Sequence, residues 1–245
     1  AECSAVMACT PIALLTSATV LLDALLAEHA AQEEHGSGGI ELGDAPIERY
    51  FLYALAWSVG GTLEAAGRAR LDTFLRGRTA NLPPANGGGG SGDIATLFDY
   101  RVDETTGAWS HWRSHLPDWA PPDGARGEGR LAAAFPSLFV PTVDSVRNEA
   151  ALRLSLGCGR AVLFVGGPGT AKTSTILQHL AQQDRSSTIC KKLSFSSATT
   201  PLIFQRAVEG SVEKRQGRTL GPPGGKSMVV FVDDISMPEY NEWGD

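Results

Sequence analysis

The stretch AVLFVGGPGTAKTS, residues 161–174, decides the fold of the second part of this chain. Its apolar run, Ala161–Val165, predicts a buried strand, and the residues from Lys172 to Gln183 have the pattern of a helix. A glycine-rich turn between a buried strand and a helix is the setting in which phosphate-binding loops occur. Glycines let backbone N–H groups surround phosphate oxygens, and the helix N-terminus adds positive potential. The stretch therefore predicts a nucleotide-phosphate site in an α/β fold.

The residues of this loop differ in what they offer to a nucleotide. Lys172 is placed to reach the β- and γ-phosphates, and the hydroxyl of Thr173 is a ligand for Mg²⁺. Ala171 stands where the GxxxxGK[ST] pattern has its second glycine, and we expect it to be tolerated there by adopting a helical φ. The alternative interpretation is a glycine-rich turn that holds no ligand. The residues assigned to nucleotide binding are Gly166, Gly167, Pro168, Gly169, Thr170, Ala171, Lys172, Thr173 and Ser174.

A second apolar run, Met228–Val232, ends in two adjacent acids, Asp233 and Asp234, 61 residues after Lys172. An apolar strand that ends in acids after such a loop is typical of P-loop ATPases. Asp233 is expected to hold Mg²⁺ through water, and Asp234 to be the catalytic carboxylate that polarises the attacking water. Aspartate is one methylene shorter than the glutamate found there in many ATPases, so we expect slow or water-relayed hydrolysis.

Charge divides the chain into parts of different character. Its 245 residues carry a net charge of −6, which argues against a general nucleic-acid binder, and 42% are hydrophobic, which argues against disorder. Residues 1–80 hold ten acids and five bases, and residues 81–137 hold seven acids and four bases. Residues 138–245 hold ten acids and twelve bases. All five lysines lie in the last part. We therefore expect units of different character.

Hydrophobic periodicity and turn residues give each part an expected structure. Residues 1–80 predict a helical subdomain with helices near 12–30, 47–59 and 63–76. Residues 81–137 predict a linker with Gly/Pro-rich loops and a β-hairpin around Thr106–Gly107. In residues 138–245 the expected strands alternate with the expected helices, which predicts a partial parallel-sheet core. Its expected helices are 141–156, 172–183 and 201–215, and its expected strands are 161–165, 189–195 and 228–232.

Some clusters of functional residue types are expected to be structural. His111 and His115 lie one helical turn apart, but a zinc site needs more ligands than these, and no further ligand lies nearby in the sequence. Trp109, Trp112 and Trp119 could form a stacking platform for single-stranded nucleic acid. Their acidic surroundings disfavour that role, so we expect them to pack in a core.

Two further segments imitate functional motifs. The apolar segment 11–27 is interrupted by polar residues, so it predicts a buried amphipathic helix rather than a membrane span. The segment GPPGGKS, residues 221–227, resembles a phosphate loop but contains two prolines and precedes a strand. Because no helix N-terminus follows it, this segment predicts a stiff surface loop.

Seven segments carry a family resemblance: IERYFLYALAWS (47–58), PTVDSVR (141–147), FSSATTP (195–201), EGSVEKR (209–215), GPPGGK (221–226), VDDISMP (232–238) and NEWGD (241–245). They resemble dynein heavy chains, and look most like the third AAA+ module of an axonemal dynein. The resemblance is dense over residues 140–245 and looser over 1–120. The segment 47–58 looks like the small helical subdomain of the preceding, second module. Residues 141–147 are similar to the segment that enters the third module.

The resemblance implies a ring of six unequal AAA+ modules that uses ATP to move along microtubules, in the cytoplasm of a cilium or in a flagellum axoneme. Residues 1–80 would be the small subdomain of the second module, and residues 138–245 the first half of a regulatory third module. The implied cofactors are ATP or ADP with Mg²⁺. By the same resemblance, Val140, Pro141 and Thr142 would border the adenine.

The implied partners are neighbouring AAA+ modules, microtubules, and other dynein heavy, intermediate and light chains, with no nucleic acid and no membrane. We also expect the chain to be a piece of a longer protein that does not fold autonomously. Two alternatives stay open at this point. One is another ring-forming AAA+ remodelling ATPase, and the other is a structural module that holds ADP without turnover.

Overall fold

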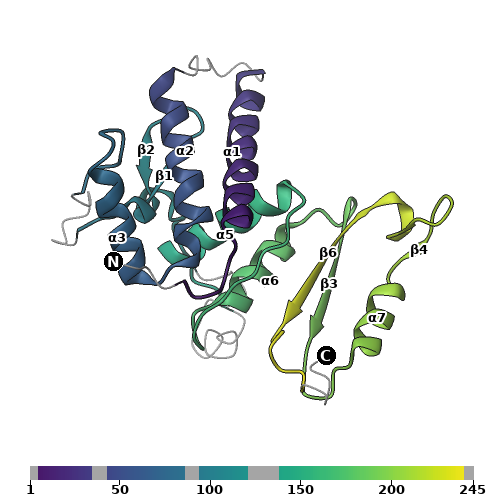
Figure 1. Cartoon of the computed structure of the whole chain (residues 1–245). Coiled ribbons are helices and arrows are strands. Elements are labelled where there is room, and N and C mark those ends of the chain that lie inside the picture. The colour runs from purple at the N-terminus through teal and green to yellow at the C-terminus, as the bar shows by residue number, and fades with distance from the viewer. Residues whose placement is uncertain (1–4, 35–42, 86–93, 121–137, 240–245) are drawn as a thin grey trace. The chain divides into compact units, whose positions relative to one another are not determined.

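The structure, a computed structural model, describes residues 5–34, 43–85, 94–120 and 138–239 (Figure 1). The chain forms two compact units, Ala1–Thr170 and Ala171–Asp245. The first unit is mainly helical, and the second is built of helices and strands. The boundary between the units falls inside the predicted phosphate loop, between Thr170 and Ala171.

Helices build the core of the first unit. Among its described residues, the α-helices are α1 (Pro11–Glu34), α2 (Asp44–Ser58), α3 (Ala65–Arg76) and α5 (Val143–Gly157), close to the ranges that periodicity predicts. Helix α1 packs against both α2 and α5. The main buried cluster combines α1, α2 and α5 with residues of the hairpin segment 100–115, and consists of Leu25, Tyr50, Tyr53, Ala54, Val102, Trp112 and Leu154. A second cluster joins α2 and α3 through Leu52, Ala56, Leu75, Leu97 and Phe98.

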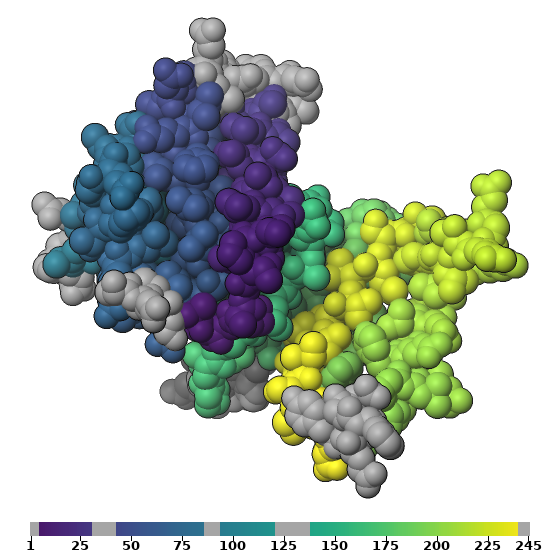
Figure 2. All heavy atoms as spheres, in the orientation of Figure 1, coloured from purple at the N-terminus to yellow at the C-terminus, as the bar shows by residue number. Residues whose placement is uncertain are grey.

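Helix α1 is more exposed than the sequence predicts. Leu25 is 6% exposed, but Ile12 is 77% and Leu15 66% exposed, so only one side of the helix packs into the core. Figure 2 shows α1 along the surface of the face in view. By length and composition alone, the segment Pro11–Ala30 could cross a membrane, and 11% of its apolar window is buried. The expectation of a buried helix is therefore wrong for most of its surface.

A short β-hairpin lies between α3 and α5 in the sequence, where Thr106–Gly107 predicts it. Strands β1 (Tyr100–Val102) and β2 (Trp109–His111) are antiparallel, with Val102 opposite Trp109. The turn is closed by the N–H of Gly107, which donates to the carbonyl of Asp103 at 2.8 Å, and Gly107 has φ +61. A left-handed φ favours glycine at that position. The Gly/Pro-rich loops are predicted at 81–92 and 120–130, and most of both lies outside the described residues, which omit 86–93 and 121–137.

The second unit has the predicted α/β character. It contains α6 (Lys172–Gln182), β3 (Thr188–Ser194), α7 (Pro201–Glu209), β4 (Glu213–Lys214), β5 (Leu220–Gly221) and β6 (Ser227–Asp233). Strands β3 and β6 are parallel, in a register that runs from Thr188 opposite Ser227 to Ser194 opposite Asp233. Strands β4 and β5 form a separate antiparallel pair. The parallel pair brings the carboxyl ends of β3 and β6 to one edge of the sheet.

Two predicted elements of the α/β part are wrong. Ala161–Val165 forms no strand in the described structure, and Leu163 and Val165 are 53% and 59% exposed. A strand exists only when its backbone is paired, and apolarity alone does not supply a partner. Helix α7 ends at Glu209 rather than near 215, because Gly210 caps it by donating its N–H to the carbonyl of Arg206. Glycine is a weak helix former, and the short strand β4 begins at Glu213.

Candidate functional site

The predicted phosphate loop leads into the N-terminus of α6, and Lys172 is the first residue of that helix. Within the first unit, the hydroxyl of Thr170 donates to the carbonyl of Gly167 at 2.9 Å. Gly169 has φ +75, and open space surrounds the positions of a Cβ on Gly167 and Gly169. Backbone of this kind can turn its N–H groups toward an anion.

Ala171 differs from its predicted conformation. We expected a right-handed helical φ, but Ala171 has φ 58 and ψ 19, in the left-handed region. Its carbonyl still accepts the N–H of Thr175 at 2.9 Å and so begins α6. The reason is positional: Ala171 is the N-cap residue, which lies outside the helical φ/ψ region. A left-handed conformation costs an ordinary L-residue about 1–2 kcal/mol, so the glycine of the common pattern has a physical basis here.

The structure brings together Thr173 and Asp233, the two residues predicted to hold Mg²⁺. Thr173, in the first turn of α6, donates its hydroxyl to Oδ1 of Asp233, at the end of β6, at 2.9 Å. The side chain of Asp233 is 18% exposed. Hydroxyl and carboxylate oxygens are the ligands that Mg²⁺ prefers, and the ion usually keeps several waters beside them. The donor set therefore fits Mg²⁺ together with the phosphates of a nucleotide.

Lys192 is a neighbour of this pair that sequence reasoning missed. Its Nζ lies 3.7 Å from Oδ2 of Asp233 and 5.8 Å from the ring centroid of Phe231. Side chains alternate along a strand, so Lys192 shares a face with Ser194, which pairs with Asp233. Strand register was therefore the signal that could have found Lys192.

Asp234, the predicted catalytic carboxylate, lies just beyond the end of β6. It is exposed and has φ 54. Its carbonyl accepts the N–H of Met237 at 3.0 Å, which forms a tight turn. Among the residues that the structure describes, Ala171 and Asp234 are the non-glycine residues with positive φ. Ala171 directly precedes α6, which carries Thr173, and Asp234 directly follows β6, which carries Asp233.

The residues proposed to border the adenine belong to the first unit, whereas Lys172 and Asp233 belong to the second. Thr142 is the N-cap of α5: its Oγ1 accepts the N–H of Ser145 at 3.2 Å, and its own N–H donates to Oγ of Ser145 at 2.8 Å. Val140 is 53% exposed. Val140 and Pro141 precede this cap, so the clear local role of the segment is to begin α5.

The histidines and tryptophans set aside above have local structural partners. Nδ1 of His111 accepts the N–H of Arg113 at 3.0 Å, and Nε2 of His115 lies 2.9 Å from the hydroxyl of Ser110. Among the described residues, no group of three or more His, Cys, Asp or Glu side chains could hold a metal ion. Trp112 is 1% exposed, as expected for a core residue. Trp119 is 41% exposed, so its predicted core position is wrong.

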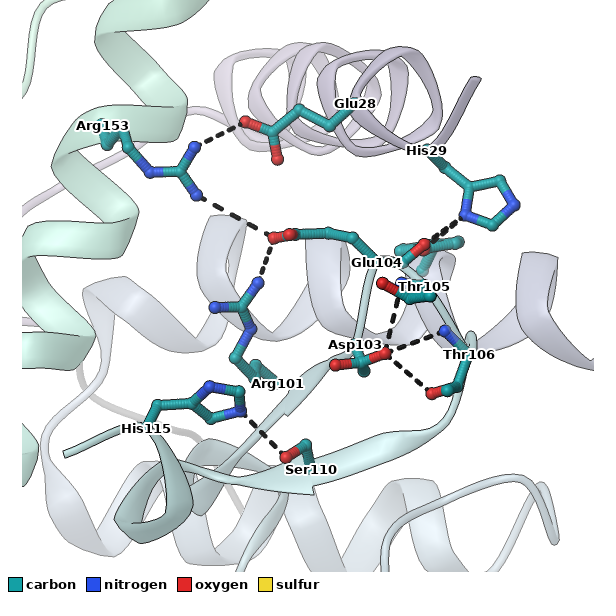
Figure 3. A network of polar contacts seen from close by, with 11 residues as sticks. Glu28, His29, Arg101, Asp103, Glu104, Thr105, Thr106, Ser110, His115 and Arg153 are labelled. Carbon is teal, nitrogen blue, oxygen red and sulfur yellow. Dashed lines mark hydrogen bonds and ion pairs between the residues drawn. The ribbon is translucent and has the colours of Figure 1, made fainter. Parts of the chain in front are cut away.

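A polar network ties the hairpin turn to α1 and α5 within the first unit (Figure 3). Arg153 of α5 lies between two acids, with nitrogens 3.0 Å from Oε1 of Glu28 and 3.9 Å from Oε1 of Glu104. Glu104 also pairs with Arg101 of β1, and its carbonyl lies 2.7 Å from Nδ1 of His29. The network is polar but closed by protein groups on three elements, which is the arrangement of a structural support.

Asp103 in the hairpin turn and His115, in the short 3-10 helix that follows β2, have shifted pKa values. Burial lowers the pKa of the His115 imidazole from its usual range, and the charge of Arg101 lowers it further. For Asp103, burial acts to raise the pKa, but the N–H and hydroxyl of Thr106 and the N–H of Thr105 outweigh it, and the net shift is downward. Both shifts favour a neutral His115 and a charged Asp103 in the folded hairpin.

Comparison with known proteins gives the class of this chain. Residues 130–245 match the family described as "P-loop containing dynein motor region", and residues 1–114 match the "Dynein heavy chain AAA lid domain". Between them, the two family models leave only residues 115–129 unmatched. The fold is thus that of a helical lid followed by part of a P-loop AAA+ core. The chain belongs to the dynein heavy-chain family.

Individual relatives agree with this assignment. The dynein gamma chain of the flagellar outer arm of Chlamydomonas reinhardtii is 48% identical over 206 residues, which cover 84% of this chain and 4% of that protein. Dynein axonemal heavy chain 5 of Mus musculus is 40% identical over 236 residues, 95% of this chain and 5% of that protein. Dynein axonemal heavy chain 10 of Homo sapiens is 34% identical over 242 residues, which cover 96% of this chain and 5% of that protein. This chain therefore spans about a twentieth of the length of these relatives.

Proposed function

We propose that residues 166–174, together with Asp233, bind a magnesium nucleotide. The observation that carries this proposal is the 2.9 Å hydrogen bond between the hydroxyl of Thr173 and Oδ1 of Asp233. It places two oxygen ligands together beside Lys172, at the N-terminus of an eleven-residue helix. Lys172 and the loop N–H groups would hold the phosphates, and Thr173 and Asp233 would hold Mg²⁺ directly or through water. A bound Mg²⁺ would neutralise phosphate charge.

We further propose that the chain works within an axonemal dynein motor, as the names of its relatives suggest. On this proposal the whole protein is an ATPase that moves along microtubules in the axoneme of a cilium or flagellum. Residues 1–80 would be the small subdomain of the second AAA+ module, residues 81–137 a linker, and residues 138–245 the first half of the third. The third module would be regulatory, and its partners would be neighbouring modules and other dynein chains.

A second candidate function is a structural module that holds ADP without turnover. Asp234 favours it, because this acid is shorter than glutamate and begins a turn in a left-handed conformation. In both cases the nucleotide would bind through the same residues. The two functions differ in whether ATP at this site is converted to ADP during the cycle of the motor.

The test of nucleotide binding is Lys172→Ala in the full-length protein, with Lys191→Ala as the matched control on β3. We expect cryo-electron microscopy with Mg²⁺ and ATP to show nucleotide at α6 in the parent protein and the control, and none in Lys172→Ala. Nucleotide density that persists in Lys172→Ala would contradict the assignment of this lysine. Absence of nucleotide from the parent site at millimolar ATP would contradict the proposed function itself.

A further inference from the structure

Strand β6 ends abruptly at the residue that Thr173 contacts. The carbonyl of Asp233 accepts the N–H of Phe195 at 3.0 Å, just past the last paired residues of the parallel ladder, Ser194 and Asp233. The next residue, Asp234, has φ 54, and its carbonyl accepts the N–H of Met237 at 3.0 Å. The chain therefore turns one residue after the carboxylate that faces Thr173.

The residue type at 234 suits this backbone conformation. Aspartate and asparagine enter the left-handed region more readily than other non-glycine residues, because their short polar side chains can bond locally. For an ordinary residue such as alanine, the penalty is equivalent to a factor of about five to thirty in population. Glutamate, the common residue in ATPases, has no such preference. The backbone thus gives a reason for aspartate at this position that does not involve catalysis.

Resting on the proposed nucleotide site, we propose that Asp234 is a positioning residue: its left-handed backbone ends β6 and holds Asp233 against Thr173. Its carboxylate then has no part in activating water. The effect acts through Asp233, whose side chain is fixed by Thr173 on one oxygen and by Lys192 on the other. If residue 234 leaves the left-handed region, the end of β6 shifts, and the Mg²⁺ ligands separate.

A positioning role for Asp234 predicts that substitutions are tolerated according to how readily they adopt the left-handed conformation, and not according to charge. Asparagine and glycine both accept the left-handed conformation, and neither carries a carboxylate. Alanine and glutamate disfavour it, and glutamate keeps the charge. A catalytic carboxylate requires the opposite ranking, because asparagine and glycine would abolish hydrolysis and glutamate would sustain or accelerate it. The four variants therefore separate the two roles.

The experiment uses the full-length protein and a fluorescent ADP analogue titrated with and without Mg²⁺. Because other sites could bind the probe, the signal of Lys172→Ala is subtracted to isolate this site. The variants are Asp234→Asn, Asp234→Gly, Asp234→Ala and Asp234→Glu. Glu239→Ala is the control, since Glu239 is an exposed acid five residues further on without positive φ. Single-turnover hydrolysis of ATP is measured on the same set.

We expect Asn and Gly to keep the Mg²⁺-dependent affinity within about twofold, and Ala and Glu to weaken it by about five- to thirtyfold. Affinity without Mg²⁺ should stay constant in all four, which a general loss of structure would not produce. Equal Mg²⁺-dependent affinity across the four variants would overturn the proposal. So would loss of hydrolysis in Asn and Gly at unchanged affinity. If the parent protein shows no binding signal after the signal of Lys172→Ala is subtracted, the proposed nucleotide site fails instead.

Discussion

The hydroxyl of Thr173 donates a hydrogen bond of 2.9 Å to Oδ1 of Asp233, and so joins the first turn of α6 to the last residue of β6. The two residues lie 60 positions apart in the sequence. This bond organises the candidate nucleotide site before any ligand enters it. Its removal should therefore change both the local stability and the Mg²⁺ dependence of binding.

Thr173→Val tests that bond, because valine keeps the shape of threonine and removes the hydroxyl. We expect the free energy of protection against amide hydrogen exchange in the first turn of α6 to fall by about 1 kcal/mol, the usual net value of one hydrogen bond. Amide hydrogen exchange of the full-length protein measures this loss. Thr173→Ser is the control and should retain most of the protection. Equal exchange in the two variants would show that the contact has no energetic role.

Lys192→Met tests the electrostatic neighbour of the same carboxylate. The lysine Nζ lies 3.7 Å from Oδ2 of Asp233, so its positive charge competes with a divalent cation. Both side chains are partly exposed, so we expect a modest increase in Mg²⁺-dependent nucleotide affinity, about two- to fivefold. Lys191→Met removes the same charge from the adjacent residue, whose side chain points to the other face of β3, and should change the affinity less. A fall in affinity in Lys192→Met would mean that the lysine binds phosphate instead.

Ala171→Gly should stabilise the start of α6. Glycine adopts φ 58 without the steric penalty of a Cβ, although it loses more backbone entropy on folding. We expect a net gain of about 1 kcal/mol in protection of the Thr175 N–H, which bonds to the carbonyl of residue 171. Ala69→Gly, in the middle of the right-handed helix α3, should instead cost about 1 kcal/mol. A loss of protection in Ala171→Gly would contradict the left-handed assignment.

His115 should make the hairpin sensitive to pH. Burial and Arg101 lower the pKa of His115 in the folded state, so the unfolded chain binds a proton at a higher pH than the folded chain does. The stabilising contribution is complete above about pH 6.5, the ordinary pKa, and is lost as the pH falls through the folded value. Hydrogen exchange of β1 and β2, corrected for intrinsic rates, measures this effect. His115→Gln should remove the dependence, and His111→Gln should retain it.

The pair Arg153 and Glu28 should couple α5 to α1 only weakly. Their side chains are 48% and 31% exposed, so we expect a coupling free energy of about 0.2–1 kcal/mol. A double-mutant cycle with Arg153→Met and Glu28→Gln isolates this value, and 0.5 M salt should reduce it. A coupling that salt does not change would indicate that Arg153 acts through its packing instead.

Local patterns predicted the elements whose stability is decided locally. The helices α2, α3 and α6 follow from apolar periodicity, and β6 follows from an apolar run that ends in an acid. The same reasoning failed for Ala161–Val165, because a strand depends on partners elsewhere in the chain and not on its own composition. Similarly, the shortening of α7 depends on a single capping glycine, which periodicity does not weigh.

The candidate site was predicted in its residue types but not in its conformation. The pattern around Lys172 and the acids after β6 named Thr173 and Asp233, which the fold brings into contact. It did not give the left-handed backbone of Ala171 and Asp234, because φ depends on how the chain leaves one element and enters the next. Lys192 was missed because its place beside Asp233 depends on the register of β3 and β6.

The tryptophans of the helical unit have a spectroscopic consequence. Four of the five, Trp57, Trp109, Trp112 and Trp119, lie in that unit, and the fifth is Trp243. Trp112, buried in the core, should emit at shorter wavelengths than Trp119, which is exposed to water. With Trp243→Phe, the tryptophan fluorescence of residues 1–245 would arise from the helical unit alone. Tryptophan emission would then report on the helical unit, and a labelled nucleotide would report separately on the phosphate site.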